Sequence, residues 1–474
     1  MQSVWETDGG VYFGQQVAKA ANQDSPLQGI WASTGGEHRY KGDRHIVTVG
    51  PNGSGKTMRL LLPNLYYLKN WSVLVVDPKG DLAVQTHLHR RASGSEIVTL
   101  DPFGVIASRF PKLVAKYPDL RNRPINPLAS LDPKSDDFPD DAKKIGEAII
   151  KVEGDEPHWS LSARALVAGI AMALRVQFPE DADFKSVRTT ISFEPGNLAS
   201  FIATRFLRDL PEGLQAVSAK LNRFTRFSDD NRELASVLAT AITQTDWLDS
   251  TPVQKSLAGG AYDFAQMKER PITVYLILPP RYLETHATWL RLMITTVLMP
   301  LIRSPEGRVP VLFMLDEFAQ LGRLEVIEQN MALMRGYGIK LWPVFQDLAQ
   351  AKDIYEKRWE SFIGNAGVLH SFAPQDVTTR KYISELSGQK LYWMQVTSTG
   401  SSQNMGQQFS QGTSSTTGWQ NQQGPVWWPQ DLAMMEDGQG VLFSRGKAVR
   451  GNFPYPTELA GVTDMIRAAM AEAR

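Results

Sequence analysis

The segment Gly-Pro-Asn-Gly-Ser-Gly-Lys-Thr at residues 50–57 limits the folds open to this chain. It follows a short apolar run at 44–49 and precedes a helix-forming stretch at 58–68, so it joins an expected strand to an expected helix. Its glycines let successive backbone N–H groups turn toward one anion, and the helix N-terminus adds favourable partial charge. The alternative is a chance glycine-rich turn, which the flanking strand and helix disfavour. The pattern therefore predicts a phosphate-binding loop.

Each residue of this phosphate loop (residues 50–57) has an expected role in binding a nucleotide. Lys56 is expected to reach the β- and γ-phosphate oxygens, and the Thr57 hydroxyl is expected to bind a magnesium ion. The expected cofactors are therefore ATP and Mg²⁺. The residues expected to contact the nucleotide are Gly50, Pro51, Asn52, Gly53, Ser54, Gly55, Lys56 and Thr57.

Two carboxylates end an apolar run at residues 309–317. We expect Asp316 to hold the metal with Thr57, and Glu317 to polarise the attacking water. Taken alone, an apolar strand that ends in two acidic residues is more often a solvated strand end. The phosphate loop earlier in the chain favours the catalytic interpretation.

Two further polar residues are candidates for catalysis. Gln346 follows an expected strand at 340–344 and could sense the γ-phosphate from a neighbouring strand. Arg335 precedes Gly336-Tyr-Gly338, which should end the helix that follows Asp316 and leave the guanidinium facing outward. The alternative for both residues is a solvated or helix-capping side chain.

Short apolar runs alternate with amphipathic helical stretches, which predicts an α/β fold with a mostly parallel central sheet. A long segment with helical patterning and almost no strand signal separates the third run from the fourth, which predicts an inserted all-α domain. The expected domains are 1–135 and 263–474, which together bind nucleotide, and 136–262, which is helical. Residues 397–424 are almost entirely Ser, Thr, Gln, Asn and Gly and are expected to form a flexible loop. The eight expected strands lie at 44–50, 72–77, 96–100, 272–278, 311–316, 340–344, 367–372 and 440–443.

The amino-acid composition limits which binding partners and which cellular compartment are expected. The 474 residues include 50 Lys and Arg and 50 Asp and Glu, so any site for DNA must be a local patch. The absence of cysteine excludes disulfides and Cys-ligated metals, and it suits the cytoplasm. The uncharged apolar runs at 165–174 and 292–302 are shorter than the roughly 20 residues of a spanning helix, so no transmembrane segment is expected.

One local patch of positive charge lies in the expected helical insertion. It combines Arg and Lys with Phe. In nucleic-acid-binding proteins such residues bind phosphates and stack on bases. The alternative is an amphipathic helix pair with buried Phe and solvated Arg. A protein-docking role is a third alternative. The residues are Arg205, Arg208, Lys220, Arg223 and Arg226, interleaved with Phe201, Phe206, Phe224 and Phe227.

The order of these motifs resembles the coupling proteins of type IV secretion and conjugation systems, of the TraG and TraD type. The resemblance covers most of residues 40–455. Besides the phosphate loop, it is carried by Asp77-Pro-Lys-Gly-Asp81, Asp101-Pro-Phe-Gly, Val274-Tyr-Leu-Ile-Leu-Pro-Pro280, Leu315-Asp-Glu-Phe-Ala-Gln320, Arg335-Gly-Tyr-Gly338, Gln346-Asp-Leu-Ala-Gln350, Phe443-Ser-Arg-Gly446 and Tyr455.

The resemblance implies a RecA-like P-loop NTPase fold and ATP hydrolysis that passes DNA, nucleoprotein or effector proteins into a type IV secretion channel. It implies a homo-hexameric ring when active, with a monomer in isolation as the alternative. Within the ring, the arginine at position 335 would act on a neighbouring subunit's site, and the glutamine at position 346 would contact the γ-phosphate. Such proteins normally begin with transmembrane helices. We therefore expect either the soluble portion of such a protein or a cytoplasmic branch that docks on a partner at the inner membrane.

Two other functions remain open at the level of sequence. A nucleotide-switched adaptor could recruit protein effectors without pumping them. A chromosome-pumping ring ATPase of the septal or archaeal type would use the same phosphate loop. DNA should raise ATP turnover steeply in a motor and hardly at all in an adaptor.

Overall fold

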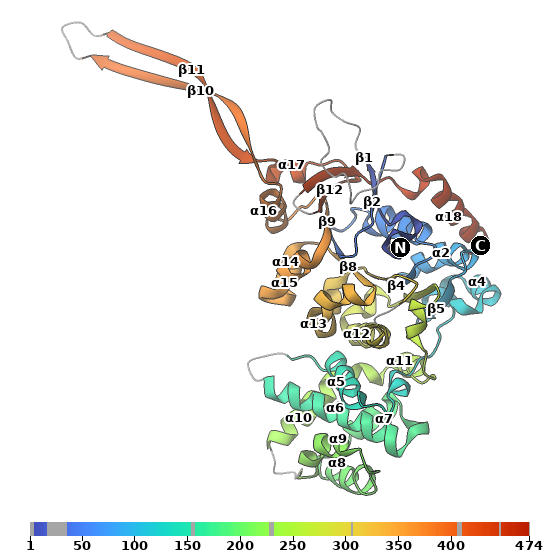
Figure 1. Ribbon diagram of the computed structural model, residues 1–474. Coiled ribbons are helices and arrows are strands. Elements are labelled where there is room, and N and C mark those ends of the chain that lie inside the picture. The colour runs from blue at the N-terminus through green and yellow to red at the C-terminus, as the bar shows by residue number, and fades with distance from the viewer. Residues whose placement is uncertain are drawn as a thin grey trace.

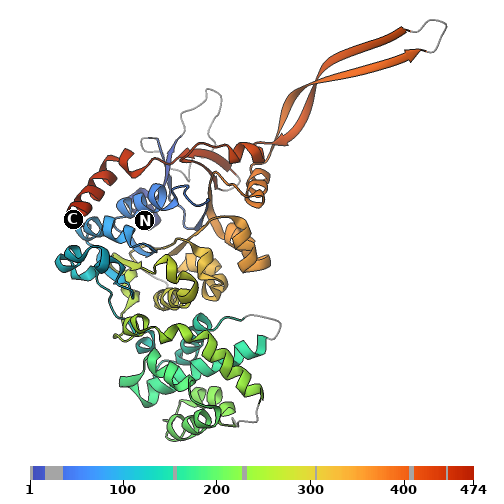
Figure 2. The ribbon, with the colours of Figure 1, turned by 180° about the vertical axis from the view of Figure 1, so that it is seen from behind.

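The computed structural model describes residues 4–16, 36–152, 157–226, 232–304, 307–404, 410–444 and 447–473. A mixed sheet forms its centre, and two layers of helices cover that sheet (Figure 1). A separate group of helices lies at one end of the molecule, and a long hairpin projects from the other end (Figures 1 and 2).

The sheet has eleven strands among the described residues, in the order β2-β1-β13-β12-β9-β3-β8-β7-β4-β6-β5. Strands β9 to β5 in this order run parallel, and the other four pair antiparallel at one side. The strands of this sheet are β1 (Val11–Gln16), β2 (Glu37–Tyr40), β3 (His45–Val49), β4 (Ser72–Val76), β5 (Glu96–Leu100), β6 (Ile272–Leu276), β7 (Val311–Leu315), β8 (Ile339–Phe345), β9 (Ala366–Phe372), β12 (Gln439–Ser444) and β13 (Lys447–Asn452).

All eight strands expected from the sequence are present. The parallel strands are buried on both faces, which explains why they read as continuous apolar runs. Alternate side chains of β4 enter different cores: Val73 and Val75 face one core, whereas Leu74 and Val76 face the other.

Helices α1, α2 and α18 pack in one of these cores, and α12 to α15 pack in the other. Those outside the helical group are α1 (Leu62–Tyr67), α2 (Asp81–Ala92), α3 (Val105–Arg109), α4 (Pro111–Lys116), α12 (Pro280–Arg303), α13 (Glu325–Met334), α14 (Leu348–Tyr355), α15 (Trp359–Asn365), α16 (Val377–Leu386), α17 (Pro429–Ala433) and α18 (Ala460–Ala473). Three short turns matter for the site, namely η2 (Lys56–Leu61), η10 (Phe318–Leu321) and η11 (Arg335–Tyr337).

The separate helical group occupies the chain between β5 and β6, where the described residues contain no strand. This agrees with the expected helical patterning, while the boundaries at 136 and 262 stay predictions. Its helices are α5 (Phe138–Ile149), α6 (Pro157–Gln177), α7 (Phe184–Ile191), α8 (Pro195–Phe201), α9 (Gln215–Leu221), α10 (Arg232–Gln244) and α11 (Thr251–Ser256).

Among the described residues, α6 is the one helix whose length and apolar composition would suit a membrane span. However, 67% of its most apolar stretch is buried inside the protein. It packs against α5, α7, α9 and α10, which is the setting of a core helix. The expectation from sequence considered only the uncharged run at 165–174, which Arg164 and Arg175 bound within this longer helix.

The expectation of a flexible loop at 397–424 is wrong for its described part. Residues 405–409 lie outside the described residues, and the rest forms a two-stranded antiparallel hairpin of β10 (Gln389–Asn404) and β11 (Ser410–Pro425). A hairpin satisfies its backbone groups by cross-strand pairing, so its polar residues can be ordered without a buried core. Thr, abundant here, also favours extended backbone.

Candidate active site

The phosphate loop leaves β3 at the carboxyl edge of the parallel strands and leads directly into η2 and α1, as the sequence predicts. Gly50 N donates to Phe345 O at 3.0 Å, which anchors the start of the loop to β8. Gly53 and Gly55 have φ of 81° and 82°, a region that side-chain-bearing residues rarely adopt. A Cβ on Gly55 would also stand 2.7 Å from Arg59 Cδ. The loop conformation therefore requires glycine at these positions.

Lys56 is buried inside the loop. Its Nζ donates to Gly50 O at 2.7 Å and to Pro51 O at 3.1 Å. Burial lowers the pKa of the Lys56 ammonium group, while Glu317 and Asp316 act to raise it. A cation held here by loop carbonyls, with two carboxylates nearby, can respond to a phosphate group that enters the loop.

Thr57 and Asp316 meet across two neighbouring segments. The Thr57 Oγ1 hydroxyl donates to Asp316 Oδ2 at 2.7 Å, although the residues are far apart in sequence. Burial raises the pKa of Asp316, and the hydrogen bond from Thr57 lowers it. The described residues hold no group of three or more His, Cys, Asp or Glu placed for a metal. Two adjoining oxygen ligands suit Mg²⁺, which takes few protein ligands and completes its shell with water and substrate phosphates.

Glu317 and Gln346 form a second pair beside the first. Gln346 Nε2 donates to Glu317 Oε2 at 2.7 Å, and Gln350 Nε2 donates to Gln346 Oε1 at 3.3 Å. The pair can form because β8 lies between β3, which carries the phosphate loop, and β7, which ends before Asp316. The structure thus brings Lys56, Thr57, Asp316, Glu317 and Gln346 to one edge of the sheet.

Arg335 lies elsewhere. It begins η11, before the first residue of β8, and its Nε pairs with Asp43 Oδ2 at 3.1 Å. The two side chains are 50% and 44% exposed, which agrees with the expected outward direction. Asp43 precedes β3, whereas the phosphate loop follows it, and a five-residue strand spans about 17 Å. Arg335 is therefore at the opposite edge of the sheet from its own phosphate loop.

Two of the quoted Asp-Pro motifs cap helices. Asp77 Oδ2 accepts from Ala83 N at 2.8 Å, and Asp101 Oδ2 accepts from Ile106 N at 3.0 Å. Burial raises the pKa of Asp77 to about 7. These contacts fix the first turns of α2 and α3 beside the carboxyl ends of β4 and β5. In the Phe443-Ser-Arg-Gly motif, Arg445 and Gly446 lie outside the described residues.

The structure adds one residue that the sequence analysis missed. Arg59 is buried and donates to Phe453 O and Asp437 Oδ2, both at 2.5 Å. Its guanidinium lies 3.5 Å from the centre of the Tyr455 ring. A charged residue inside the apolar run Met58-Arg-Leu-Leu-Leu62 was the one available signal, because its partners lie almost four hundred residues away.

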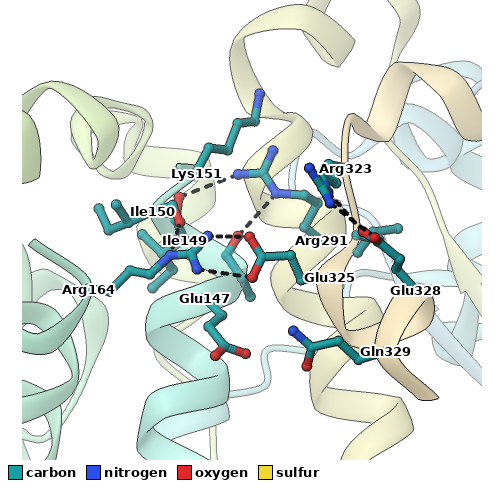
Figure 3. A network of polar contacts seen from close by, with 12 residues as sticks. Glu147, Ile149, Ile150, Lys151, Arg164, Arg291, Arg323, Glu325, Glu328 and Gln329 are labelled. Atoms are coloured by element: carbon teal, nitrogen blue, oxygen red, sulfur yellow. Dashed lines mark hydrogen bonds and ion pairs between the residues drawn. The ribbon is translucent and has the colours of Figure 1, made fainter. Parts of the chain in front are cut away.

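Two arginines connect the helical group to the segment that follows Glu317 (Figure 3). Arg164 of α6 donates to Ile150 O at 2.7 Å and pairs through both terminal nitrogens with Glu325 at the start of α13. Arg291 of α12 donates to carbonyls at the end of α5 and, at 3.5 Å, to Leu321 O at the end of η10. The helical group is thereby bonded to the two segments that come next after the acidic pair.

The described rings in the Arg-Phe patch are packed inward. Phe206 and Phe224 are buried, and Phe201 stacks edge-on against Phe206 at 5.0 Å between ring centres. Arg205, Arg208 and Arg223 are exposed. This is the amphipathic alternative, because the described rings of the patch are not free to stack bases. The side chain of Arg226 and all of Phe227 lie outside the described residues.

The family model described as "Type IV secretory system Conjugative DNA transfer" matches residues 3–451. The chain belongs to this family. The resemblance inferred from the motifs is thus confirmed.

Conjugal transfer protein TraG of Escherichia coli is 25% identical over 376 residues, which are 74% of this chain and 56% of TraG. Protein VirD4 of Rhizobium rhizogenes is 26% identical over 414 residues, which are 85% of this chain and 57% of VirD4. The chain therefore spans less than two thirds of the length of these relatives.

Solved structures show the same fold. The plasmid coupling protein TrwB in complex with ADP and Mg²⁺ matches with a TM-score of 0.65 and 13% identity, over 94% of each chain. The unbound monoclinic form of TrwB matches with a TM-score of 0.63 and 14% identity, over 91% of this chain and 90% of TrwB. At this identity the likeness shows the fold alone. It confirms the predicted α/β fold, with a mostly parallel central sheet and an added helical domain.

Proposed function

We propose that this chain is the motor portion of a type IV secretion coupling protein, which hydrolyses Mg²⁺-ATP to drive DNA or nucleoprotein into the secretion channel. The observation that carries the proposal is the pairing of Thr57 with Asp316 and of Gln346 with Glu317, both at 2.7 Å, beside the phosphate loop. Family membership and the conjugal transfer function of TraG support DNA as the cargo. TrwB, of the same fold, has been solved in complex with ADP and Mg²⁺ and with non-hydrolysable analogues of ATP and GTP.

The residues divide the work of hydrolysis. Thr57 and Asp316 would hold Mg²⁺, which would offset the negative charge of the phosphates. Lys56 and the loop N–H groups bind the β- and γ-phosphates. Glu317 holds the attacking water and takes up its proton. Gln346 orients the Glu317 carboxylate through one N–H, and its second N–H is available to the γ-phosphate.

Arg335 has a role only if copies of the chain share their sites. It lies at the opposite sheet edge from its own phosphate loop and is half exposed, so it could reach the loop of a neighbouring copy in a ring. An arginine supplied in this way stabilises charge in the transition state and raises turnover roughly 10³- to 10⁵-fold. We propose a homo-hexamer as the active form.

The contacts of Arg164 and Arg291 support coupling between cargo and hydrolysis. They link the helical group to α13 and to η10, and η10 begins directly after Glu317. A displacement of the helical group by cargo would therefore change the position of η10 and, with it, of Asp316 and Glu317. DNA or a protein effector could be the cargo that does this.

The test is ATP turnover of the purified chain with and without DNA, at low and at high salt. The proposal predicts that DNA raises turnover, that added salt removes the increase because phosphate contacts are lost, and that Lys56→Ala abolishes turnover in every condition. Turnover that DNA leaves unchanged would contradict the motor and favour the nucleotide-switched adaptor. Full turnover in Lys56→Ala would contradict the site itself.

A further inference from the structure

A buried arginine lies directly beneath the phosphate loop. Arg59 is 4% exposed, and its stem packs so closely under Gly55 that a Cβ there would stand 2.7 Å from Arg59 Cδ. Its two terminal nitrogens donate to Phe453 O and Asp437 Oδ2, so the guanidinium has a fixed position. Because a buried guanidinium needs such partners, these contacts also tie the C-terminal segment to the loop.

An exposed aromatic ring stacks on this guanidinium. The centre of the Tyr455 ring lies 3.5 Å from Arg59 Cζ, and the residue is 41% exposed. The backbone N–H of Tyr455 donates to Glu458 Oε1 at 2.9 Å, which holds the main chain of Tyr455 in place. The ring thus lies on the guanidinium, its backbone is held by Glu458, and the residue is still open to solvent.

The strand register places this ring at the edge of the sheet where the phosphate loop lies. β9 runs parallel to β3, so both strands end at this edge. β12 enters the sheet at Gly440, which is paired with Phe372, the last residue of β9. Phe453 N donates to Gly438 O at 2.7 Å, and Tyr455 follows two residues later. Ligands of open α/β sheets bind at this carboxyl edge.

We propose that Tyr455, held on Arg59, is the stacking platform for the base of the nucleotide whose phosphates bind at residues 50–57. The inference rests on the proposed function and adds to it the place where the base binds and the acceptance of either purine. Stacking uses the face of a base and not its hydrogen-bonding edge, so adenine and guanine should bind alike. The ring contributes to affinity for the nucleoside half, and the loop to affinity for the phosphates.

The competing interpretation is that Tyr455 only shields Arg59 and thereby supports the loop. The two interpretations differ in what they predict for a ligand without a base. A shielding ring would matter equally for a nucleotide and for inorganic tripolyphosphate, because both use the loop. A stacking platform would matter for the nucleotide alone.

Calorimetric titration in the presence of Mg²⁺ separates them. The ligands are the non-hydrolysable imido analogues of ATP and GTP and inorganic tripolyphosphate. The variants are Tyr455→Ala, Tyr455→Phe, and Trp393→Ala as a control, since Trp393 is 68% exposed on the distant hairpin. We expect Tyr455→Ala to weaken both nucleotide analogues by roughly 5- to 150-fold and to leave tripolyphosphate unchanged. Tyr455→Phe and Trp393→Ala should match the wild type.

Three results would overturn the proposal. Equal losses for nucleotide and tripolyphosphate would show that the ring only supports the loop. Unchanged nucleotide affinity in Tyr455→Ala, while Lys56→Ala abolishes binding, would show that the phosphate site is real and the base lies elsewhere. If the wild-type chain binds neither kind of ligand, the phosphate site itself is wrong, and the platform is wrong with it.

Discussion

Glu317 is the residue whose conformation says most about its role. Its φ of 52° lies in the left-handed region, which is uncommon for a residue with a side chain and costs of order 1 kcal/mol. The hydrogen bond from Gln346 Nε2 to its carboxylate stabilises this conformation. Strain of this kind is tolerated where a side chain must point in one particular direction. Here that direction is toward Gln346 at the carboxyl edge of the sheet.

Glu317→Gln should leave ATP bound but unhydrolysed. The amide keeps the size of the side chain and loses the carboxylate that takes up a proton, so we expect turnover to fall roughly 10²- to 10⁴-fold with little change in ATP affinity. Steady-state turnover and calorimetric binding measure the two quantities. Glu385→Gln, on the exposed surface of α16, is the matched control and should behave as wild type. A loss of ATP binding in Glu317→Gln would assign the water-holding role to another residue.

At the scale of single residues, local motifs predicted most of the candidate site. Lys56 and Thr57 are recognisable because the loop is continuous in sequence, and Asp316 and Glu317 because they end an apolar strand. Their roles, and those of Gln346 and Arg335, stay predictions. Arg59 could not be found in this way, since its partners come from the opposite end of the chain.

Among the strands, β9 carries a titratable group in the dry core beside the phosphate loop. Burial lowers the pKa of His370 to about 3, and the ring lies between the rings of Phe372 and Phe453, each 4.5 Å away. The folded state therefore holds His370 neutral, whereas the unfolded state binds a proton below its usual pKa of about 6.5. Between these two values the unfolded state binds more protons. Stability falls as the pH is lowered through this window.

His370→Phe should flatten this acid dependence. Phenylalanine cannot bind the proton that His370 takes up in the unfolded state. We therefore expect the free energy of unfolding to fall by about 1.4 kcal/mol less per pH unit below pH 6 than in the wild type. Urea unfolding at pH 7.5 and pH 5 measures the difference. His158→Phe, at an exposed position on α6, should leave the slope unchanged. An unchanged slope in His370→Phe would show that His370 is not the group responsible.

The hairpin is the element most loosely joined to the rest. Its two strands pair with each other and form a sheet of their own. Replacing residues 398–416, which lie beyond the Thr397–Thr417 pair, by a short glycine linker should therefore shift the melting temperature by less than about 2 °C, because closing a surface loop costs little. Differential scanning calorimetry measures it. A fall of many degrees would show that the distal hairpin contributes to the stability of the main fold.

Strands were predictable where an uninterrupted apolar run marks them, and much less so where polar residues interrupt the run. The parallel strands are recognisable in the sequence as apolar runs because helices cover both of their faces. β1, β2 and β13 were missed because they contain polar residues and pair at the antiparallel side of the sheet, where β1 joins β13 from the opposite end of the chain. The hairpin was missed because its polar composition gives no core signal, although its backbone pairing is regular over sixteen residues of each strand.

At the scale of the whole molecule, the candidate site is divided. The helical group and the hairpin lie at opposite ends, and the phosphate loop lies at the carboxyl edge of the parallel strands (Figure 1). Five candidate residues meet at that edge, whereas Arg335 pairs with Asp43 at the other. One copy cannot bring Arg335 to its own phosphate loop without a large rearrangement of its sheet. In the proposed ring, Arg335 of one copy would instead lie at the phosphate loop of the next.

The central claim is thus that hydrolysis takes place between two copies of the chain. Mixing Arg335→Ala with Lys56→Ala in equal amounts tests it most directly, with co-purification of one affinity-tagged variant to confirm that the two variants assemble together. Each variant alone should be almost inactive, with a loss of roughly 10³- to 10⁵-fold for Arg335→Ala. The mixture should regain measurable ATP turnover, because some intact phosphate loops would then face an intact Arg335. A co-assembled mixture that is no more active than its separate components would contradict the shared site and the ring mechanism built on it.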